Sequence, residues 1–243
     1  MLIAIIPARG GSKRIPQKNI RLFAGKPMIA HSIIVAQQSK LFDHIYVSSE
    51  AEEILSIAKE WGAEQILRPK ELADDHIETA PVVRHAIDWM KQEDIHFDAL
   101  CCICATAPFI KTKDLIAGWK RLQKKEEGQV FAATSYGYPI HRSFQKIEPD
   151  GLQMFFPEHY HSRSQDLPQA YHDAGQFGWG RENSWNDENI GIGNNSTMIE
   201  LPRWRVVDID TEEDWKHAEI VYSIMKNNQN TPNPIIKNKD DIL

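Results

Sequence analysis

Twelve residues near the N-terminus combine basic side chains with glycine in a way that suits phosphate binding. They read ARGGSKRIPQKN over residues 8–19 and follow the apolar run LIAIIP. Glycine lets backbone N–H groups approach phosphate oxygens, because no Cβ stands in the way. Arg9 and Lys18 could then neutralise a triphosphate whose leaving pyrophosphate gains charge. The segment matches neither G-x-G-x-x-G nor G-x-x-x-x-G-K-[ST], which disfavours a dinucleotide site and a P-loop. The alternative, a solvated charged loop, is weakened by the interleaved glycines and by Pro16.

A second candidate, VDIDTEED over residues 207–214, contains two carboxylates two positions apart. In a strand, Asp208 and Asp210 project to the same face. Two oxygen ligands on one face suit Mg²⁺, which takes one or two carboxylates together with phosphate oxygens. The alternative is structural, because Thr211 and Asp214 form a capping box and Asp210 would stabilise a helix N-terminus. The spacing leaves the role of Asp210 open and favours a structural role for Asp214.

Charge is distributed unevenly along the 243 residues. The net charge is −6, yet the first 42 residues hold seven Lys or Arg and no acidic residue. One basic block in an acidic protein indicates a local anion site, whereas nucleic-acid binders usually spread positive charge along a face. No apolar run approaches the roughly 20 residues that span a bilayer, and the start lacks a signal peptide's basic leader and cleavage site. We therefore expect a soluble cytoplasmic protein with no nucleic-acid or membrane partner.

Cysteine and histidine offer weaker candidates. Cys101, Cys102 and Cys104 lie within four residues, with no distant partner for a disulfide and no second ligand pair for zinc. We interpret them as small residues of a buried strand. His159 and His161 lack further ligands at regular spacing, which disfavours a histidine metal centre. No G-x-S-x-G motif supports a serine nucleophile.

These candidates need a scaffold of alternating strands and helices. The apolar runs predict strands over residues 2–7, 44–48, 64–67, 97–104 and 130–135. Helical patterns cover residues 28–39, 51–61, 78–91 and 113–125. This rhythm predicts an α/β fold with a mostly parallel sheet and helices on both of its faces. Ligands of such sheets bind beyond the carboxyl ends of the strands, which is where residues 8–19 begin.

The rhythm breaks over residues 136–200, which are rich in aromatic residues, Pro, His and Gly and show no helical period. We interpret them as an irregular, antiparallel insertion that covers the site or pairs subunits. A strand over 204–209 and a helix over 211–225 follow. Residues 1–135 and 201–226 would form the nucleotide-binding catalytic domain. Residues 227–243 are polar, contain two prolines and are predicted to be a flexible tail.

The N-terminal segment IPARGGSKRIPQKN resembles the signature of the CMP-sialic acid synthetases and related acidic-sugar cytidylyltransferases. Further matches follow in order along the chain: VSSE over residues 47–50 and LRPKELADD over residues 67–75. The resemblance implies a Rossmann-like nucleotidyltransferase fold with a mainly parallel mixed sheet, and a homodimer in which the insertion reaches towards the partner. It also implies Mg²⁺ as cofactor and CTP as substrate.

The resemblance assigns roles to individual residues. Catalysis falls to Arg9, Lys18, Asn19, Asp208 and Asp210, of which the two aspartates hold the metal. The remaining CTP contacts are Ala8, Gly10, Gly11, Ser12, Lys13, Arg68 and Thr79, the last near cytosine. The reaction it implies is attack by an anomeric hydroxyl on the α-phosphorus of CTP, releasing pyrophosphate without a covalent intermediate.

The acceptor sugar is indicated by a third stretch. RSQDLPQAYHDAG over residues 163–175 resembles a segment of the wider family, and its continuation YHDAGQF is similar to the pseudaminic acid cytidylyltransferases. CATAPF over residues 104–109 stands where sialate enzymes have Q-P-T-S-P, so that Cys104 replaces a sugar-binding Gln and alters the acceptor pocket. Gly178 occupies a position where a tyrosine is expected. The residues predicted to contact the sugar are Cys104, Thr106, Arg163, Gln165, His172 and Gln176.

The predicted enzyme therefore transfers CMP from CTP to pseudaminic acid. Two alternatives stay open at this point. One is the same reaction on another acidic sugar, such as N-acetylneuraminate, legionaminate or an octulosonate. The other is a nucleotide-binding module that has lost catalysis, against which the joint presence of the two basic and two acidic catalytic residues argues.

Overall fold

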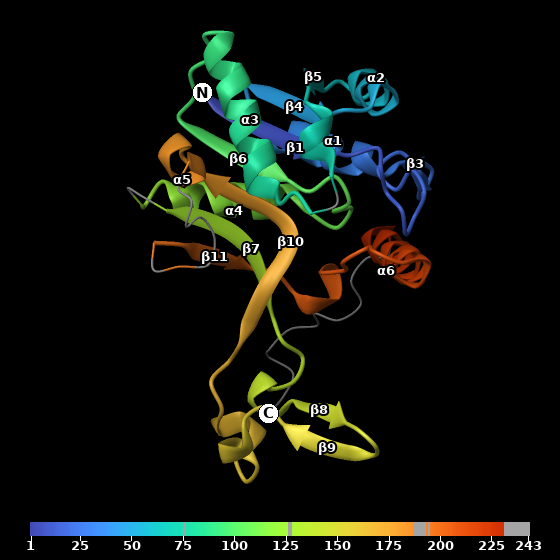
Figure 1. Ribbon diagram of the computed structural model, residues 1–243. Coiled ribbons are helices and arrows are strands. Elements are labelled where there is room, and N and C mark those ends of the chain that lie inside the picture. The colour runs from blue at the N-terminus through green and yellow to red at the C-terminus, as the bar shows by residue number, and fades with distance from the viewer. Residues whose placement is uncertain (75, 126–127, 187–192, 194, 231–243) are drawn as a thin grey trace, which may run out of the picture.

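A sheet of seven strands forms the centre of the molecule (Figure 1). The computed structural model describes residues 1–74, 76–125, 128–186, 193 and 195–230. The strand order is β11-β7-β10-β6-β1-β4-β5. β10 is antiparallel to both of its neighbours, and the other neighbouring pairs are parallel. The predicted mainly parallel, mixed sheet is confirmed. The strands are β1 (Leu2–Pro7), β4 (His44–Ser49), β5 (Glu64–Leu67), β6 (Ala99–Ile103), β7 (Gln129–Ser135), β10 (Tyr171–Gly180) and β11 (Thr197–Glu200).

Helices cover both faces of the sheet, and β1 shows why. Its side chains alternate between faces. Ile3 and Ile5 pack with residues of α3, whereas Ala4 and Ile6 pack with residues of α1, α2 and α4. All four are fully buried, so an uninterrupted apolar run belongs at the middle of the sheet. The helices are α1 (Met28–Ser39), α2 (Glu52–Glu60), α3 (Thr79–Gln92), α4 (Thr112–Leu122), α5 (Glu182–Asn186) and α6 (Glu212–Asn230).

Two strands of this sheet come from the segment that the sequence assigned to an insertion. β10 lies between β6 and β7, and β11 forms the edge beside β7. The pattern of β10 gave little sign of a central strand, because glycines stand at positions 175, 178 and 180. Residues 136–170 lie outside the sheet, and we call them the lobe.

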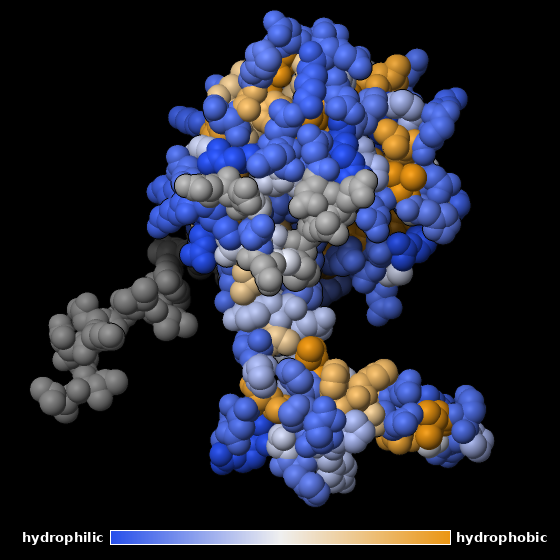
Figure 2. Space-filling view, turned by 60° about the vertical axis from the view of Figure 1, so that its left-hand side comes forward, coloured by the Kyte–Doolittle hydropathy of each residue, from blue (hydrophilic) through white to orange (hydrophobic). Residues whose placement is uncertain are grey.

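The lobe hangs below the sheet on the extensions of β7 and β10 (Figure 1). It is built around the hairpin of β8 (Phe144–Ile147) and β9 (Gly151–Met154) and short 3₁₀ turns. Large apolar side chains are exposed on it: Tyr138 is 88% exposed and Leu152 is 70% exposed. Figure 2 shows orange patches on this lower part of the molecule. Exposed apolar side chains that gather on one part of a molecule are typical of an interaction face.

The strand predicted over residues 204–209 is wrong. Arg203–Arg205 form a 3₁₀ turn, and the following residues are extended without a strand partner. Pro202 contributes no N–H to a ladder, and Arg205 turns inward to the carboxylate of Asp114. The extended segment leads into α6, which packs against the short hairpin of β2 (Leu22–Phe23) and β3 (Lys26–Pro27).

The structure describes only the first four residues of the predicted tail, 227–230. Residues 227–230 continue α6, and 231–243 lie outside the described residues. Among the described residues, no helix combines the length and the apolar character needed to cross a bilayer.

Candidate active site

The turn after β1 is held in place by its own backbone and by the next strand. Ala8 N–H donates to the carbonyl of Ser48 at 3.0 Å, and the amide of Asn19 donates to the carbonyl of Arg9 at 2.8 Å. Gly10 N–H donates to Oε1 of Glu50 at 2.7 Å. A Cβ at Gly10 would lie 3.0 Å from that of Ala51, so glycine favours this close approach. The turn is therefore preorganised.

Glu50 connects the turn to the segment that carries Arg68. Its Oε2 accepts a hydrogen bond from Nη2 of Arg68 at 2.9 Å, and the Arg68 side chain is only 3% exposed. Burial on its own would raise the pKa of Glu50, but the bonds from Arg68 and Gly10 outweigh it and the pKa lies below its ordinary value. A carboxylate that is charged at neutral pH thus ties together three segments that are distant in sequence.

These segments surround a cleft of about 290 Å³, which we call the main cleft. It lies at the carboxyl ends of β1 and β6, as expected for a parallel sheet. Eight of the predicted site residues line it: Arg9, Ser12, Lys18, Asn19, Arg68, Thr79, Cys104 and Thr106. The other predicted residues of the turn are Ala8, Gly10, Gly11 and Lys13, which belong to its backbone frame and do not line the cleft.

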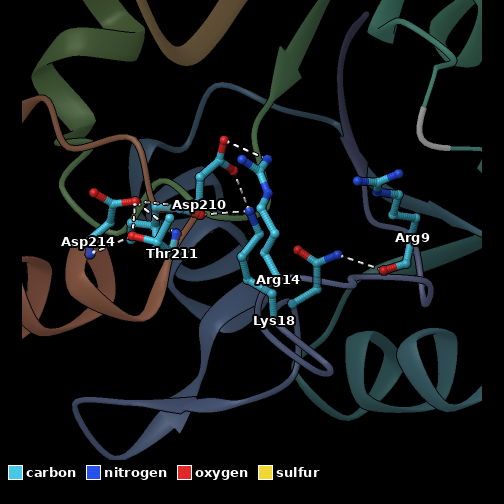
Figure 3. A network of polar contacts seen from close by, with 8 residues as sticks. Arg9, Arg14, Lys18, Asp210, Thr211 and Asp214 are labelled. Atoms are coloured by element: carbon cyan, nitrogen blue, oxygen red, sulfur yellow. Dashed lines mark hydrogen bonds and ion pairs between the residues drawn. The ribbon is translucent and has the colours of Figure 1, made fainter.

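Lys18 joins the main cleft to the acidic segment near the C-terminus. Its Nζ donates to the carbonyl of Ile209 at 2.6 Å and to Oδ1 of Asp210 at 3.1 Å. Arg14 donates to the other carboxylate oxygen of Asp210 at 2.8 Å (Figure 3). The basic turn and the aspartate pair, which are about 190 residues apart, therefore meet at one place.

The acidic segment contains one aspartate whose carboxylate caps the following helix, Asp214, and one whose carboxylate does not, Asp210. Oδ2 of Asp214 accepts hydrogen bonds from the N–H and hydroxyl of Thr211 and from the N–H of Asp210. Asp214 N–H donates back to the Thr211 hydroxyl at 3.2 Å, which completes a capping box. The capping carboxylate of Asp214 contacts the backbone of Asp210. The side-chain carboxylate of Asp210 points instead to Arg14 and Lys18 (Figure 3).

Asp208 and Asp210 flank Ile209, which is only 1% exposed. In an extended backbone this places both carboxylates on the side opposite the buried residue. Burial and, after it, the charge of Asp210 raise the pKa of Asp208 above its ordinary value. A divalent cation would relieve this crowding of like charges, so the pair fits a metal. The described residues contain no group of three or more His, Cys, Asp or Glu that could hold a metal ion.

A second cleft of about 310 Å³ adjoins the first, and we call it the side cleft. The two clefts share Glu78, Thr79, Cys102 and Cys104. Burial raises the pKa of the Cys104 thiol to about 12, so this thiol is neutral. Gln176 lines the side cleft, and its backbone carbonyl accepts a hydrogen bond from Cys104 N–H at 2.8 Å.

Three residues predicted to bind the sugar lie elsewhere. Arg163 pairs with Asp166 on the lobe at 2.7 Å, and Gln165 lines a hollow of about 260 Å³ in the lobe. His172 bonds through Nδ1 to the carbonyl of Asp173 and packs against the ring of Tyr136 at 4.8 Å. In the described part of the chain, Arg163, Gln165 and His172 do not line the main cleft or the side cleft of their own chain.

Sequence reasoning missed Arg14 and the buried pair of Arg205 and Asp114. Arg14 belongs to the basic block, so its charge was visible, but its partner was not. The Arg205 guanidinium donates to both carboxylate oxygens of Asp114, at 2.5 and 3.1 Å, and the Arg205 carbonyl accepts from the amide of Gln176. No local pattern reports a pair separated by 91 residues.

The fold is the Rossmann-like fold of nucleotidyltransferases. It aligns with the structure of a CMP:2-keto-3-deoxy-manno-octonic acid synthetase complexed with CTP, with a TM-score of 0.67, 14% identity and coverage of 92% of this chain and 99% of that one. It also aligns with 4-diphosphocytidyl-2C-methyl-D-erythritol synthase from Anaerococcus prevotii, with a TM-score of 0.59 and 12% identity over 91% and 98% of the chains.

Residues 3–225 match the family described as Cytidylyltransferase, and the chain belongs to that family. It is 43% identical to the pseudaminic acid cytidylyltransferase of Campylobacter jejuni over 91% of this chain and 96% of the relative. A Helicobacter pylori protein is 37% identical over 85% of this chain and 40% of its own length. Its name joins pseudaminic acid cytidylyltransferase to a hydrolase of a UDP-linked diacetamido-trideoxy-altropyranose. CMP-N,N'-diacetyllegionaminic acid synthase of C. jejuni is 29% identical over 92% and 95%.

Proposed function

We propose that this cytidylyltransferase transfers CMP from CTP to the anomeric hydroxyl of pseudaminic acid and releases pyrophosphate. The observation that carries the proposal is the position of Lys18. It lines the main cleft and at the same time contacts Asp210, so cationic and anionic groups suited to a metal–triphosphate complex converge. CTP is a cytoplasmic metabolite, and we assign the reaction to the cytoplasm.

The turn after β1 would hold the triphosphate. Arg9 and Lys18 neutralise the charge that builds on the departing pyrophosphate, and Asn19 keeps the turn closed through its bond to the Arg9 carbonyl. Ser12 and Lys13 complete the loop around the phosphates. Arg68 and Thr79, which line the same cleft, take the nucleoside.

Asp208 and Asp210 would hold Mg²⁺, which when bound neutralises phosphate charge and lowers the pKa of the attacking hydroxyl. Arg14 and Lys18 neutralise Asp210 in this structure and would turn to the phosphates when nucleotide binds. The sugar oxygen forms a bond to the α-phosphorus, the bond to pyrophosphate breaks, and a carboxylate of the pair accepts the hydroxyl proton. Catalysis is by positioning and charge stabilisation.

The acceptor is inferred from the relatives and from the cleft. The C. jejuni relative named for pseudaminic acid is 43% identical over 96% of its length. Of two relatives named for legionaminic acid, that of C. jejuni is 29% identical over 95% of its length, and that of Legionella pneumophila is 42% identical over only 50% of its length. Cys104 and Thr106 line the main cleft, and Cys104 and Gln176 line the side cleft. A neutral, small thiol at Cys104 cannot replace the hydrogen bonds of an amide, which favours an acceptor other than N-acetylneuraminate.

Pyrophosphate release with CTP and Mg²⁺ tests the proposal on a panel of acceptors. The panel contains pseudaminic acid, N,N'-diacetyllegionaminic acid, N-acetylneuraminic acid and a 3-deoxy-octulosonate. We expect kcat/KM to be highest for pseudaminic acid, by about tenfold or more. A preference for another sugar refutes the acceptor assignment, and tight CTP binding without turnover on any acceptor refutes the reaction.

We further propose a homodimer in which each lobe faces the partner's clefts. Arg163, Gln165 and His172 lie outside the clefts of their own chain, so a sugar bound there would meet them only from a second copy. The exposed apolar surface of the lobe supports such pairing, with Tyr138, Leu152 and Tyr160 each at least 65% exposed.

Leu152→Asp tests the dimer, because a charge at the centre of an apolar interface is poorly tolerated. We expect light scattering to show a dimer for the wild type and a monomer for the variant, with the acceptor KM raised at least about tenfold. Ile220→Asp on α6, at 59% exposed, is the matched control and should remain dimeric. A monomeric wild type that is fully active contradicts the arrangement.

A further inference from the structure

The side cleft contains a hollow produced by a missing side chain. Gly178 stands opposite Cys102 of β6 on one side and opposite Phe131 of β7 on the other. Residues directly opposite in antiparallel strands project to the same face, so these three form a row across the sheet. Cys102 packs with residues of α3, which assigns the row to the α3 face. The middle member has no side chain, and the space above it is part of the cleft.

Trp185 of α5 forms the wall of this hollow. A Cβ at Gly180 would lie 2.7 Å from Nε1 of Trp185, whereas a Cβ at Gly178 would lie 3.8 Å from Cη2. The indole therefore lies along β10, with its nitrogen end over Gly180 and its six-membered ring at the edge of the hollow. Phe131 supplies the opposite side, because its own Cβ would also lie 3.8 Å from a Cβ at Gly178. The walls are apolar, and they would accept a methyl group.

Two amide side chains add unused hydrogen-bonding groups. Gln176 is 3% exposed, and its nitrogen donates to the carbonyl of Arg205 at 2.7 Å. A carbonyl can only accept, so the amide orientation is fixed and Oε1 is the acceptor that has no partner among the described residues. Gln129, which is 7% exposed, has a side-chain nitrogen that finds no partner in the described part of the chain. Buried polar groups without partners are rare, and both of these residues line the side cleft.

The charge of the side cleft rules out the acidic end of the acceptor. Its charged lining residues are Glu78 and Asp173, and no Lys or Arg is among the described residues that line it. The basic residues Arg9, Lys18 and Arg68 line the main cleft instead. A carboxylate would be repelled here, so the side cleft suits a neutral part of the sugar.

We propose that the hollow over Gly178 binds an acylamino substituent of the acceptor sugar and so determines acceptor specificity. The substituent's N–H donates to Gln176, its carbonyl accepts from Gln129, and its methyl group packs between Trp185 and Phe131. This inference rests on the proposed function and adds to it the group that is recognised. The missing side chain at Gly178 would leave space for the substituent, and the indole of Trp185 would line that space.

Filling the hollow provides the test. In Gly178→Leu the side chain occupies the proposed subsite, whereas the Cβ of Gly178→Ala makes only ordinary contacts. We compare pseudaminic acid, which carries two acetamido groups, with a nine-carbon 3-deoxy-2-keto acid that carries hydroxyls only. In Gly178→Leu we expect the pseudaminate KM to rise at least about tenfold and its preference over the hydroxyl acceptor to fall by a similar factor, with the KM for CTP unchanged. Gly178→Ala should show a smaller change in the same direction.

Gly193→Leu is the matched control, because a Cβ there meets no atom of the described residues within 4 Å. Gln129→Met removes the unpaired donor at nearly constant volume and should reduce the same preference. Thermal unfolding midpoints separate misfolding from loss of recognition, and Gly178→Ala carries the test if Gly178→Leu does not fold. Equal losses on both acceptors, or unchanged kinetics, overturn the inference. A wild type that transfers CMP to no acylated sugar refutes the proposed function itself, which is a separate outcome.

Discussion

Two arginine–aspartate pairs, each joined by two hydrogen bonds, lie in different regions of the molecule. In the sheet domain, Arg205 donates two hydrogen bonds to Asp114, and the two side chains are 3% and 7% exposed. On the lobe, Arg163 donates two hydrogen bonds to Asp166, but those side chains are 72% and 50% exposed. The pairs differ mainly in how much water reaches them, and this difference separates a fixed region from an adaptable one.

The buried pair fixes the frame of the site. Arg205 lies three residues before Asp208, its carbonyl holds Gln176, and its Nη1 also donates to the carbonyl of Phe109 at 3.2 Å. The exposed pair fixes nothing beyond its own turn, since water competes for both partners. The buried pair therefore holds residues beside the clefts in one arrangement, while the exposed pair leaves the Arg163 side chain adaptable.

Asp114→Asn should have the largest effect on stability. Removing one charge leaves Arg205 buried without compensation, which costs about 3–5 kcal/mol. The carboxylate also accepts a hydrogen bond from Lys111 N–H at the start of α4, so the helix end is weakened as well. Urea unfolding measures the change. A loss below about 1 kcal/mol, the range of exposed pairs, would mean that the two pairs do not differ as burial implies.

Lys18→Met breaks the contact between the main cleft and the acidic segment. We expect kcat to fall by about 10²–10³, because a preorganised positive charge on the departing pyrophosphate is lost. The unfolding free energy should change little by comparison. Steady-state kinetics with saturating CTP and acceptor measure the effect, and Lys124→Met on the exposed end of the α4 region is the control. Unchanged turnover would exclude Lys18 from the chemistry.

Local pattern predicted the first half of the fold well and the second half poorly. The helix at Met28–Ser39 and the strand at Leu2–Pro7 have the bounds predicted, because uninterrupted apolar residues and helical spacing are local signals. β10 escaped prediction because it is stabilised by its two neighbours and not by its own sequence. The strand predicted over 204–209 failed because Arg205 packs inward against Asp114, a partner that no local window contains.

The same distinction applies to the site. The spacing of Asp208 and Asp210 predicts a shared face, and the two residues lie in an extended segment outside the sheet. The convergence of Lys18 with Asp210 required the fold, and so did the separation of Arg163 from the clefts. Sequence therefore indicated residues that the fold brings to the candidate site, while burial and distant pairs decided their arrangement.

Glu50→Gln should have an intermediate, pH-dependent effect. Its carboxylate accepts from Arg68 and Gly10, and replacing these charged hydrogen bonds should cost about 2 kcal/mol at neutral pH. The folded-state pKa of Glu50 lies below its ordinary value, so the stabilisation is present above the ordinary pKa and is lost as pH falls through the folded-state pKa. Urea unfolding of wild type and variant from neutral to acidic pH should show two curves that converge on acidification. A constant difference across this range would contradict the role of the charge.

Asp166→Asn removes the carboxylate of the exposed pair on the lobe, as Asp114→Asn removes that of the buried pair in the sheet domain. Because the Arg163 pair is open to solvent, we expect the unfolding free energy to change by less than about 1 kcal/mol. The substitution frees Arg163 from its turn. If Arg163 serves the partner's sugar site, the acceptor KM should change a few-fold while the KM for CTP stays constant, since orientation and not stability is altered. A stability loss as large as that of Asp114→Asn would show instead that the lobe pair is protected from water, as it would be if a second copy of the chain covered it.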